Sequence, residues 1–138
     1  MDRNDIMNIL PHRDHMLLVD TVEKIGDEAQ GRYYVTGEEF FLKGHFPGNP
    51  VVPGVILCEI LAQSACVLLE DQMTDEKLPM YTGLNNVKFR SPVKPGDTFE
   101  TRCRITRIKD PFYFASGEGY VGGRLCLKAE FSFAIVGD

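Results

Sequence analysis

The chain has 138 residues, of which 43% are hydrophobic and 25% are charged, and its net charge is −5. These values predict a single domain over residues 1–138 with its own core, and the negative charge argues against a general nucleic-acid-binding role. No 18-residue stretch is apolar and uncharged, and the N-terminal MDRNDIMNIL lacks the pattern of a signal peptide, so a cytoplasmic protein without a membrane span is expected.

The first part of the chain predicts a short helix and a β-hairpin. Residues 4–10 predict a helix that is capped by Asn4 and stopped by Pro11. Two strand patterns follow, over residues 17–25 and 29–36, with a tight turn expected at Gly26-Asp27.

Residues 37–53 predict an irregular but rigid loop. Three prolines fall within seven residues, at Pro47, Pro50 and Pro53. Each proline fixes one backbone angle and removes one hydrogen-bond donor, so the loop is expected to hold a defined shape.

The stretch from about residue 55 to residue 73 predicts the main helix. Apolar residues cover nearly all of its faces, which is typical of a helix that is buried on all sides. Glu59, Gln63 and the pair Glu70-Asp71 argue against a membrane span.

The second half of the chain predicts four strands, over residues 80–89, 98–108, 112–121 and 124–136. Turn sequences at residues 94–97 and 121–124 indicate antiparallel pairing. The predicted fold class is therefore α+β, with an antiparallel sheet of about six strands wrapped round one long helix. A second subunit could cover the side of the helix that the sheet leaves open.

Basic residues concentrate in one stretch of this acidic chain. Residues 86–109 contain two acids and seven basic residues: Lys88, Arg90, Lys94, Arg102, Arg104, Arg107 and Lys109. One interpretation is the solvated outer faces of strands, and the other is a docking surface for an acidic partner or a phosphorylated ligand.

His45 and Glu59 are the first candidates for chemistry. His45 stands at the entrance of the proline-rich loop, where a structural histidine bonded to a backbone carbonyl is the ordinary interpretation. Glu59 stands in the second turn of the apolar helix, where an unpartnered carboxylate would be costly to bury. Its presence indicates either a structural hydrogen-bond network or a proton donor whose charged form is disfavoured.

Two neighbours extend this candidate site. Gln63 lies four residues after Glu59 on the same helix face, so its amide is placed to hold the carboxyl group. Gly54 stands at the helix start, where unpaired N–H groups can polarise a carbonyl. A loop-to-helix turn that needs a small residue explains Gly54 as well.

These residues fall within blocks that resemble a known enzyme family. The block GHFPGNPVVPGVILCEILAQ closely resembles the signature of the β-hydroxyacyl-[acyl-carrier-protein] dehydratases of type II fatty-acid synthesis. LPHRDHMLLVD is similar to that family's LPHR-x-x-x-LLVD motif, and NNVKFRSPVKPGD to its third recurring block. The resemblance runs from about Ile6 to the C-terminus.

The resemblance implies a hot-dog fold, in which an antiparallel sheet wraps round a long helix, and a dimer that is commonly assembled into a trimer of dimers. His45 matches the family's catalytic histidine and Glu59 its catalytic acid, which act together from different subunits. Gly54 would bind the thioester carbonyl through its backbone N–H, and Gln63 would hold the acid.

The implied activity is that of a hydro-lyase in fatty-acid elongation. A (3R)-3-hydroxyacyl group on acyl carrier protein would lose water and become a trans-2-enoyl group. His45 would take the C2 proton and Glu59 would protonate the leaving hydroxyl, with no metal or other cofactor. The acyl chain would lie in an apolar tunnel, and the candidate dock for the acidic carrier protein is the basic stretch, with Lys88, Arg90, Lys94, Arg102 and Arg104.

One distinction between related families and two departures from the family pattern bear on specificity. Glu59 stands where the related dehydratase-isomerases carry Asp, which points to the broad-specificity dehydratases. Residues 14–16 replace an aromatic-Pro-Phe stretch that relatives often carry after LPHR. Met80 stands where some relatives place a gating tyrosine, with Tyr81 next to it, so both are candidate gate residues.

Other functions stay open at this level. An acyl thioesterase on the same fold would activate water instead of removing a C2 proton, and a non-catalytic module would only bind an acyl carrier. A zinc site of His12, His15 and His45 lacks a cysteine or carboxylate at ligand spacing. The cysteines form no C-x-x-C pair and are expected to pack as small apolar residues: Cys58, Cys66, Cys103 and Cys126.

Overall fold

The structure is a computed structural model that describes residues 1–74 and 76–137. Its centre is helix α2 (Gly54–Cys66), which continues as one 3-10 turn, η3 (Val67–Leu69). Nearly all side chains from Leu57 to Cys66 are buried, as the apolar sequence predicts. The regular helix ends seven residues earlier than expected, because the backbone tightens into η3 after Cys66 and then turns toward the next strand.

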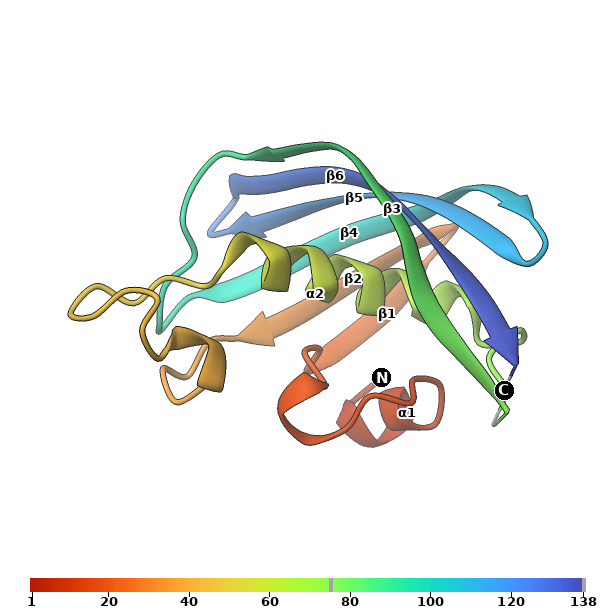
Figure 1. Ribbon diagram of the computed structural model, residues 1–138, viewed down its shortest axis with the longest axis horizontal. Coiled ribbons are helices and arrows are strands. Elements are labelled where there is room, and N and C mark those ends of the chain that lie inside the picture. The colour runs from red at the N-terminus through yellow and green to blue at the C-terminus, as the bar shows by residue number, and fades with distance from the viewer. Residues whose placement is uncertain (75, 138) are drawn as a thin grey trace.

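A six-stranded antiparallel sheet curves round this helix (Figure 1). Its strands are β1 (Thr21–Ile25), β2 (Glu28–Tyr34), β3 (Lys77–Phe89), β4 (Thr98–Lys109), β5 (Phe112–Val121) and β6 (Arg124–Gly137). Their order across the sheet is β1-β2-β4-β5-β6-β3, and every neighbouring pair is antiparallel. The predicted α+β class and hot-dog arrangement are confirmed.

The predicted strands and turns agree closely with the structure, apart from β1 and an earlier start for β3. The β5–β6 hairpin turns at Gly122 and Gly123, which both have positive φ and connect the paired residues Val121 and Arg124. A two-residue turn of this kind matches the twist of the strands and favours glycine at both positions. The core between α2 and the concave face of the sheet includes fully buried Phe99 and Phe131.

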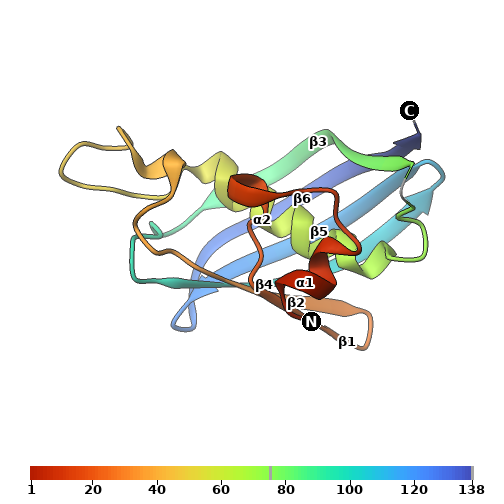
Figure 2. The ribbon, with the colours of Figure 1, turned by 90° about the horizontal axis from the view of Figure 1, so that it is seen from below.

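The N-terminal segment covers the side of α2 that faces away from the sheet (Figure 2). It comprises α1 (Arg3–Met7), the 3-10 turn η1 (Asp14–Met16) and an irregular run from Leu17 to Asp20. Ile6, Leu10 and Leu18 are almost completely buried in it. A second subunit is therefore not required to bury this side of α2.

Two predictions for this segment were wrong. Asp2, not Asn4, caps α1: its side chain accepts the N–H of Asp5, whose carboxylate accepts the N–H of Asp2 in return. Residues 17–20 do not join the first strand, because the Leu18 N–H donates to the Gln63 side chain of α2, and only Asp20, next to the strand start, bonds to β2, through the backbone oxygen of Arg32.

Residues 35–53 form the expected irregular loop, which includes one 3-10 turn, η2 (Phe40–Leu42). The part between η2 and α2 extends away from the sheet, at the left of Figure 1. Among the described residues, no helix has the length and apolar character needed to cross a bilayer.

Candidate active site

Glu59 lies in the second turn of α2, at the edge of a small pocket between the helix, the N-terminal segment and β3. The pocket has a volume of about 40 Å³ and is lined by His12, Glu59, Ala62, Gln63, Cys66, Pro79, Tyr81 and Phe133. The Glu59 side chain is 21% exposed, so it is less buried than its apolar sequence context suggests. The space is sufficient for a few waters but not for an acyl chain, so this pocket is not the expected tunnel.

A larger hollow of about 780 Å³ lies over β1, β2 and β4, away from this pocket. Its lining is mainly polar, and within it Arg32 and Glu100 form an ion pair at 3.7 Å. None of the candidate acid or base residues lines this hollow, so the Glu59 pocket is the better candidate for chemistry.

Gln63 connects Glu59 to the N-terminal segment. Its amide nitrogen donates to Glu59 Oε2 at 2.9 Å and to the backbone oxygen of Met16 at 2.8 Å. Its amide oxygen accepts the N–H of Leu18 at 2.9 Å. Gln63 is only 1% exposed, its three bonds engage both N–H groups and the oxygen of the amide, and a flipped amide would lose all three, so Glu59 Oε2 is held in one place.

His12 also lines the pocket, although its place in the sequence suggested only a zinc site, with His15 and His45. Its Nε2 lies 3.4 Å from Glu59 Oε2, although the two residues are far apart in sequence. Its Nδ1 is buried and has no hydrogen-bond partner in the described part of the chain. The LPHR motif was the signal in the sequence, but spacing alone does not place its histidine beside Glu59.

His45 lies on the loop that extends from the body of the protein. Its Nδ1 is 3.1 Å from the backbone oxygen of Val51, and its ring stacks on Phe46 with 4.2 Å between ring centroids. A carbonyl only accepts, so Nδ1 carries the proton of the neutral ring and Nε2 is left with a lone pair. The bond from Nδ1 to Val51 is typical of a structural histidine, but it also leaves Nε2 able to accept a proton.

The structure does not bring His45 and Glu59 together within one chain. His45 is absent from the pocket lining, and within residues 1–74 and 76–137 the two side chains share no hydrogen bond or ion pair. The described partners of His45 all belong to its own loop, whereas those of Glu59 belong to α2 and the N-terminal segment.

Gly54 begins α2, and Pro53 before it provides no side-chain cap. The Gly54 N–H has no hydrogen-bond partner in the described chain, which leaves it available to an incoming oxygen. A Cβ at this position would lie 2.6 Å from Cε1 of Phe89. Close packing of Phe89 is therefore one structural reason for a small residue here, beside the proposed chemical one.

Met80 and Tyr81, the two candidate gate residues, take different positions. Tyr81 lines the pocket and donates its hydroxyl to the backbone oxygen of Cys58 at 2.6 Å, whereas Met80 is exposed and does not line the pocket. Burial raises the pKa of the Tyr81 phenol, and the charge of Glu59 raises it further. The phenol therefore stays a neutral donor near pH 7.

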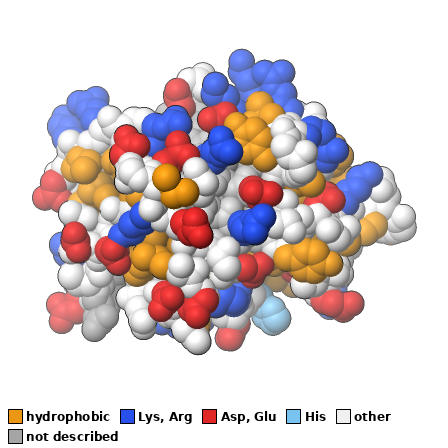
Figure 3. Space-filling model, turned by 180° about the vertical axis from the view of Figure 1, so that it is seen from behind, with side chains coloured by type: hydrophobic (Ala, Val, Ile, Leu, Met, Phe, Trp, Pro, Cys, Tyr) orange, Lys and Arg blue, Asp and Glu red, His pale blue; other side chains and the backbone are white. Residues whose placement is uncertain are grey.

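The basic stretch does not form one uniform patch. Arg104 pairs with Glu28 at 3.3 Å, and the guanidinium of Arg102 lies over the ring of Tyr120, 5.6 Å from its centroid. Figure 3 shows basic side chains interleaved with acidic ones over much of the face that it displays. Lys88, Arg90 and Lys94 are exposed at the other end of the stretch, and no ion pair engages them among the described residues.

The cysteines and histidines do not assemble into a further centre. All four cysteines are buried, and burial raises the pKa of the thiols of Cys58, Cys66 and Cys103. These thiols lack the character of activated nucleophiles. No three potential metal ligands come together in the described residues, and His15 lies against Phe40 rather than beside His12.

Comparison with known proteins identifies the family of this chain. A family model described as ApeI-like, ApeI dehydratase, matches residues 21–124. A protein of Nitratidesulfovibrio vulgaris (strain Miyazaki F) named 3-hydroxyacyl-[acyl-carrier-protein] dehydratase FabZ is 41% identical over 140 residues, which cover 98% of this chain and 91% of that protein. The protein of the same name from Fusobacterium nucleatum is 38% identical and covers 98% of this chain and 97% of its own.

Solved structures support the fold. A chain of the dehydratase heterocomplex ApeI:P from Xenorhabdus doucetiae matches with a TM-score of 0.83 at 18% identity, over 96% of this chain and 91% of that one. A putative thioesterase from Ralstonia eutropha matches less closely, with a TM-score of 0.63 at 21% identity, over 84% of this chain and 83% of that one. At such identities these structures show a shared fold alone. The sequence relatives, at about 40% identity over almost the whole chain, show that the protein belongs to the 3-hydroxyacyl-[acyl-carrier-protein] dehydratase family.

Proposed function

We propose that this protein removes water from (3R)-3-hydroxyacyl groups on acyl carrier protein and forms the trans-2-enoyl thioester. The observation that carries this proposal is the carboxyl group of Glu59, held at Oε2 by Gln63 in a small pocket while Oε1 has no partner in the described chain. A carboxyl group with one oxygen held and the other open is suited to protonate a leaving hydroxyl.

His45 is the base in this proposal. Its Nδ1 proton is engaged by Val51, so Nε2 is free to take the C2 proton of the substrate. Removal of that proton builds negative charge on the thioester oxygen. The N–H of Gly54, at the positive end of α2, would stabilise that charge, because it is unpaired and close to the surface.

The active site in this proposal forms between two subunits. Strand β3 is an edge of the sheet, and apolar side chains are exposed along it and near the His45 loop: Leu78, Met80, Tyr81, Leu84, Phe89, Phe46 and Val55. An exposed apolar edge of this length favours pairing with a second copy. A dimer through β3 would let His45 of one protomer approach Glu59 of its partner, and trimers of such dimers would follow the family pattern.

Complementation of two inactive variants tests the shared site. His45→Ala and Glu59→Gln each remove one member of the pair, and both homodimers should be inactive in hydration of crotonyl thioester. After mixed refolding, one site of each heterodimer regains both residues, so about a quarter of wild-type activity is expected from random pairing. If both residues acted within one chain, the mixture would stay inactive, and activity of either homodimer would refute the assigned role.

Product analysis separates this proposal from an acyl thioesterase and from a binding module. Mass spectrometry of 3-hydroxyacyl-carrier protein substrates of several lengths should show loss of one water with the acyl chain still attached. Released free thiol would indicate a thioesterase, and unchanged substrate would indicate a module that only binds. The same spectra would report chain-length preference and, with chromatography, any shift of the double bond.

The carrier protein would dock near Lys88, Arg90 and Lys94. Phe89, which packs on Gly54, places its neighbours Lys88 and Arg90 close to the N–H that would bind the thioester. These exposed cations suit the acidic surface of a carrier protein or the phosphate of its prosthetic arm. Arg102 and Arg104 suit this role less well, since Tyr120 and Glu28 already engage them. This docking would occur in the cytoplasm, where the carrier is expected.

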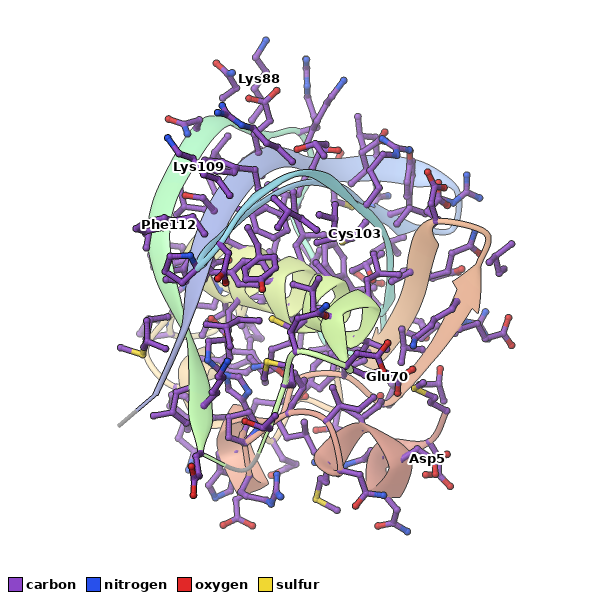
Figure 4. All side chains as sticks on the ribbon, turned by 90° about the vertical axis from the view of Figure 1, so that its right-hand side faces the viewer. Asp5, Glu70, Lys88, Cys103, Lys109 and Phe112 are labelled. Carbon is purple, nitrogen blue, oxygen red and sulfur yellow. The ribbon has the colours of Figure 1, made fainter. Side chains whose placement is uncertain are left out.

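Charge reversal tests this dock. Lys88→Glu with Arg90→Glu should raise KM for carrier-protein substrates roughly three- to tenfold and leave KM for a pantetheine thioester unchanged, because exposed charge pairs are individually weak. Figure 4 shows the Lys88 side chain pointing away from the sheet. Lys109→Glu is the control, since Lys109 is also exposed but lies by the β4–β5 turn, at the other end of the sheet from the end of β3 that carries Lys88 (Figure 1). Equal effects on both substrates would exclude docking at Lys88 and Arg90.

A further inference from the structure

His12 is a polar side chain beside Glu59 to which the proposed reaction gives no role. It lines the pocket, and its Nε2 lies 3.4 Å from Oε2, the same oxygen that Gln63 holds. Figure 2 shows the N-terminal segment that carries His12 lying across α2. The imidazole thus faces the proposed acid from the side opposite the sheet.

The surroundings of His12 favour one tautomer. Its Nδ1 is buried without a partner in the described chain. An unpaired buried N–H is rarer in proteins than an unpaired acceptor, so the proton belongs on Nε2, which faces Glu59. In the opposite tautomer, a Glu59 proton on Oε2 would point at the imidazole and away from the open pocket.

We propose that His12 is a positioning residue for the acid: its Nε2–H closes onto Oε2 of Glu59 in the substrate-bound enzyme and keeps the transferable proton on Oε1. This inference rests on the proposed role of Glu59. Because His12 and Gln63 both direct donors at Oε2, a proton on that oxygen of Glu59 is disfavoured. The proton therefore stays on Oε1, where it points into the pocket. The 3.4 Å separation fits this role, because catalytic hydrogen bonds are often long before substrate binds.

The same contact would act during the reaction. As the proton leaves Oε1, negative charge develops on the carboxyl group, and the His12 N–H stabilises it more strongly than it stabilised the neutral acid. The other titratable neighbours are Cys58, Cys66 and Tyr81, whose pKa values burial raises, so they remain uncharged near pH 7. The effect of His12 is therefore expected on kcat more than on KM.

The backbone at His12 is held in a way that suits this role. The guanidinium of Arg13 donates to the backbone oxygens of Leu10 and His12, both at 2.7 Å, and to that of Met7 at 3.0 Å. Three bonds from one side chain fix the turn that leads from α1 to His12. The imidazole is therefore directed by its own segment and not by contact with Glu59 alone.

Two substitutions at His12 test the inference in the intact oligomer. His12→Leu removes the donor, and His12→Gln places an amide N–H near the former Nε2. The leucine variant should lose kcat on the order of ten- to hundredfold in crotonyl thioester hydration, with KM changed less than about twofold, as expected for one hydrogen bond to a developing charge. The glutamine variant should recover most of kcat. His15→Leu, a control in the same segment but outside the pocket, should behave as wild type.

Each outcome decides between the inference and the proposed function. If His12→Leu is folded, oligomeric and keeps wild-type kcat while Glu59→Gln is inactive, the inference fails and the function stands. If Glu59→Gln stays active, the proposed role of Glu59 itself fails. If His12→Leu does not fold, the kcat of His12→Gln and that of His12→Asn are compared instead. Only the longer amide, that of glutamine, reaches the Nε2 position. Equal kcat in those two folded variants would overturn the positioning role.

Discussion

Two carboxylates of this protein show how hydrogen-bond partners decide the role of a residue. Glu39 receives bonds at both oxygens, from the Tyr33 hydroxyl at 2.8 Å and from backbone and side-chain donors of Thr36 and Gly37. Glu59 receives one bond, at one oxygen, and leaves the other oxygen open to a pocket. The first arrangement holds a loop in place, and the second leaves a group free to exchange a proton.

Replacement of Glu39 by Gln is expected to make stability less dependent on pH. Burial alone would raise the pKa of Glu39, but bonds from Thr36, Tyr33 and Gly37 outweigh it and lower the pKa below its ordinary value of 4.5. A lowered folded-state pKa adds stability that is complete above the unfolded-state value and is lost as the pH falls through the folded-state value. Glu39→Gln should cost about 1 kcal/mol at pH 7, and the difference should shrink below about pH 4.5 in urea unfolding. Glu38→Gln is the exposed control, and a difference that persists at pH 3 would contradict this account.

Replacement of Gln63 by Leu is expected to damage both stability and activity. The change leaves the buried N–H of Leu18 and the backbone oxygen of Met16 without partners and frees Glu59 Oε2. We expect a loss of about 2–4 kcal/mol in the free energy of unfolding, since each orphaned buried group costs about 1–3 kcal/mol. Urea titration measures this loss, with exposed Gln72→Leu as the control. Equal stability of the two variants would show that water or neighbouring groups replace the lost bonds.

At the scale of elements, the site depends on the junctions between them. Helix α2 starts directly after the loop that carries His45, and its second turn carries Glu59. Phe89, at the end of β3, packs against the start of α2, and this close contact is possible because residue 54 is a glycine. Close contacts of this kind explain the glycines at two positions, Gly54 and Gly119. The two positions should differ in how well they tolerate a larger residue.

Alanine at Gly54 and at Gly119 should separate activity from stability. A Cβ at Gly119 would lie 2.0 Å from Cζ of Phe99, which is fully buried and has no room to move. Gly119→Ala should therefore lose about 3 kcal/mol of stability through overpacking. For Gly54→Ala, the free energy of unfolding should change by less than about 1 kcal/mol, because the exposed Phe89 ring can swing away. The same variant should lose on the order of 10²-fold in kcat, because the methyl group crowds the proposed oxyanion donor. Thermal unfolding and hydration kinetics measure the pair, and the reverse ranking would contradict both assignments.

For the whole molecule, the two edges of the sheet differ in character. β1 is short and mostly charged or polar on its exposed side, whereas β3 is longer and exposes several large apolar side chains. Short, charged edges resist further pairing and long apolar ones favour it. The asymmetry predicts that a second copy joins at β3 and not at β1.

A charged substitution on each edge tests this difference. Leu84 on β3 and Ile25 on β1 are similarly exposed, at 46% and 51%. Leu84→Glu should shift the protein toward monomers in sedimentation velocity and lower activity in proportion, because the proposed site needs two chains. Ile25→Glu should leave assembly and activity unchanged. An active Leu84→Glu monomer would disprove the shared site even if every catalytic residue is assigned correctly.

The sequence by itself determined the elements that depend on local patterns. Helix α2, the strands of the second half and the turns at Gly26-Asp27 and Gly122-Gly123 follow from periodicity and turn chemistry, and the structure confirms them. The motif block also directed attention to His45, Gly54, Glu59 and Gln63. Local patterns were less reliable for the cap of α1, because Asp2 and Asn4 are both suitable caps and the choice depends on where the helix begins.

Only the tertiary structure decided how these parts meet. The strand order, with β3 beside β6 at an edge, the packing of residues 17–20 on α2 and the contact between His12 and Glu59 all join segments distant in sequence. The sheet also divided the basic stretch, since ladder neighbours engage Arg102 and Arg104 and leave Lys88, Arg90 and Lys94 open. Such contacts depend on the mutual packing of whole elements, which no window of sequence contains. For this reason the sequence could mark the Glu59 carboxyl group as unusual, but only the folded chain shows that His12 lies beside it.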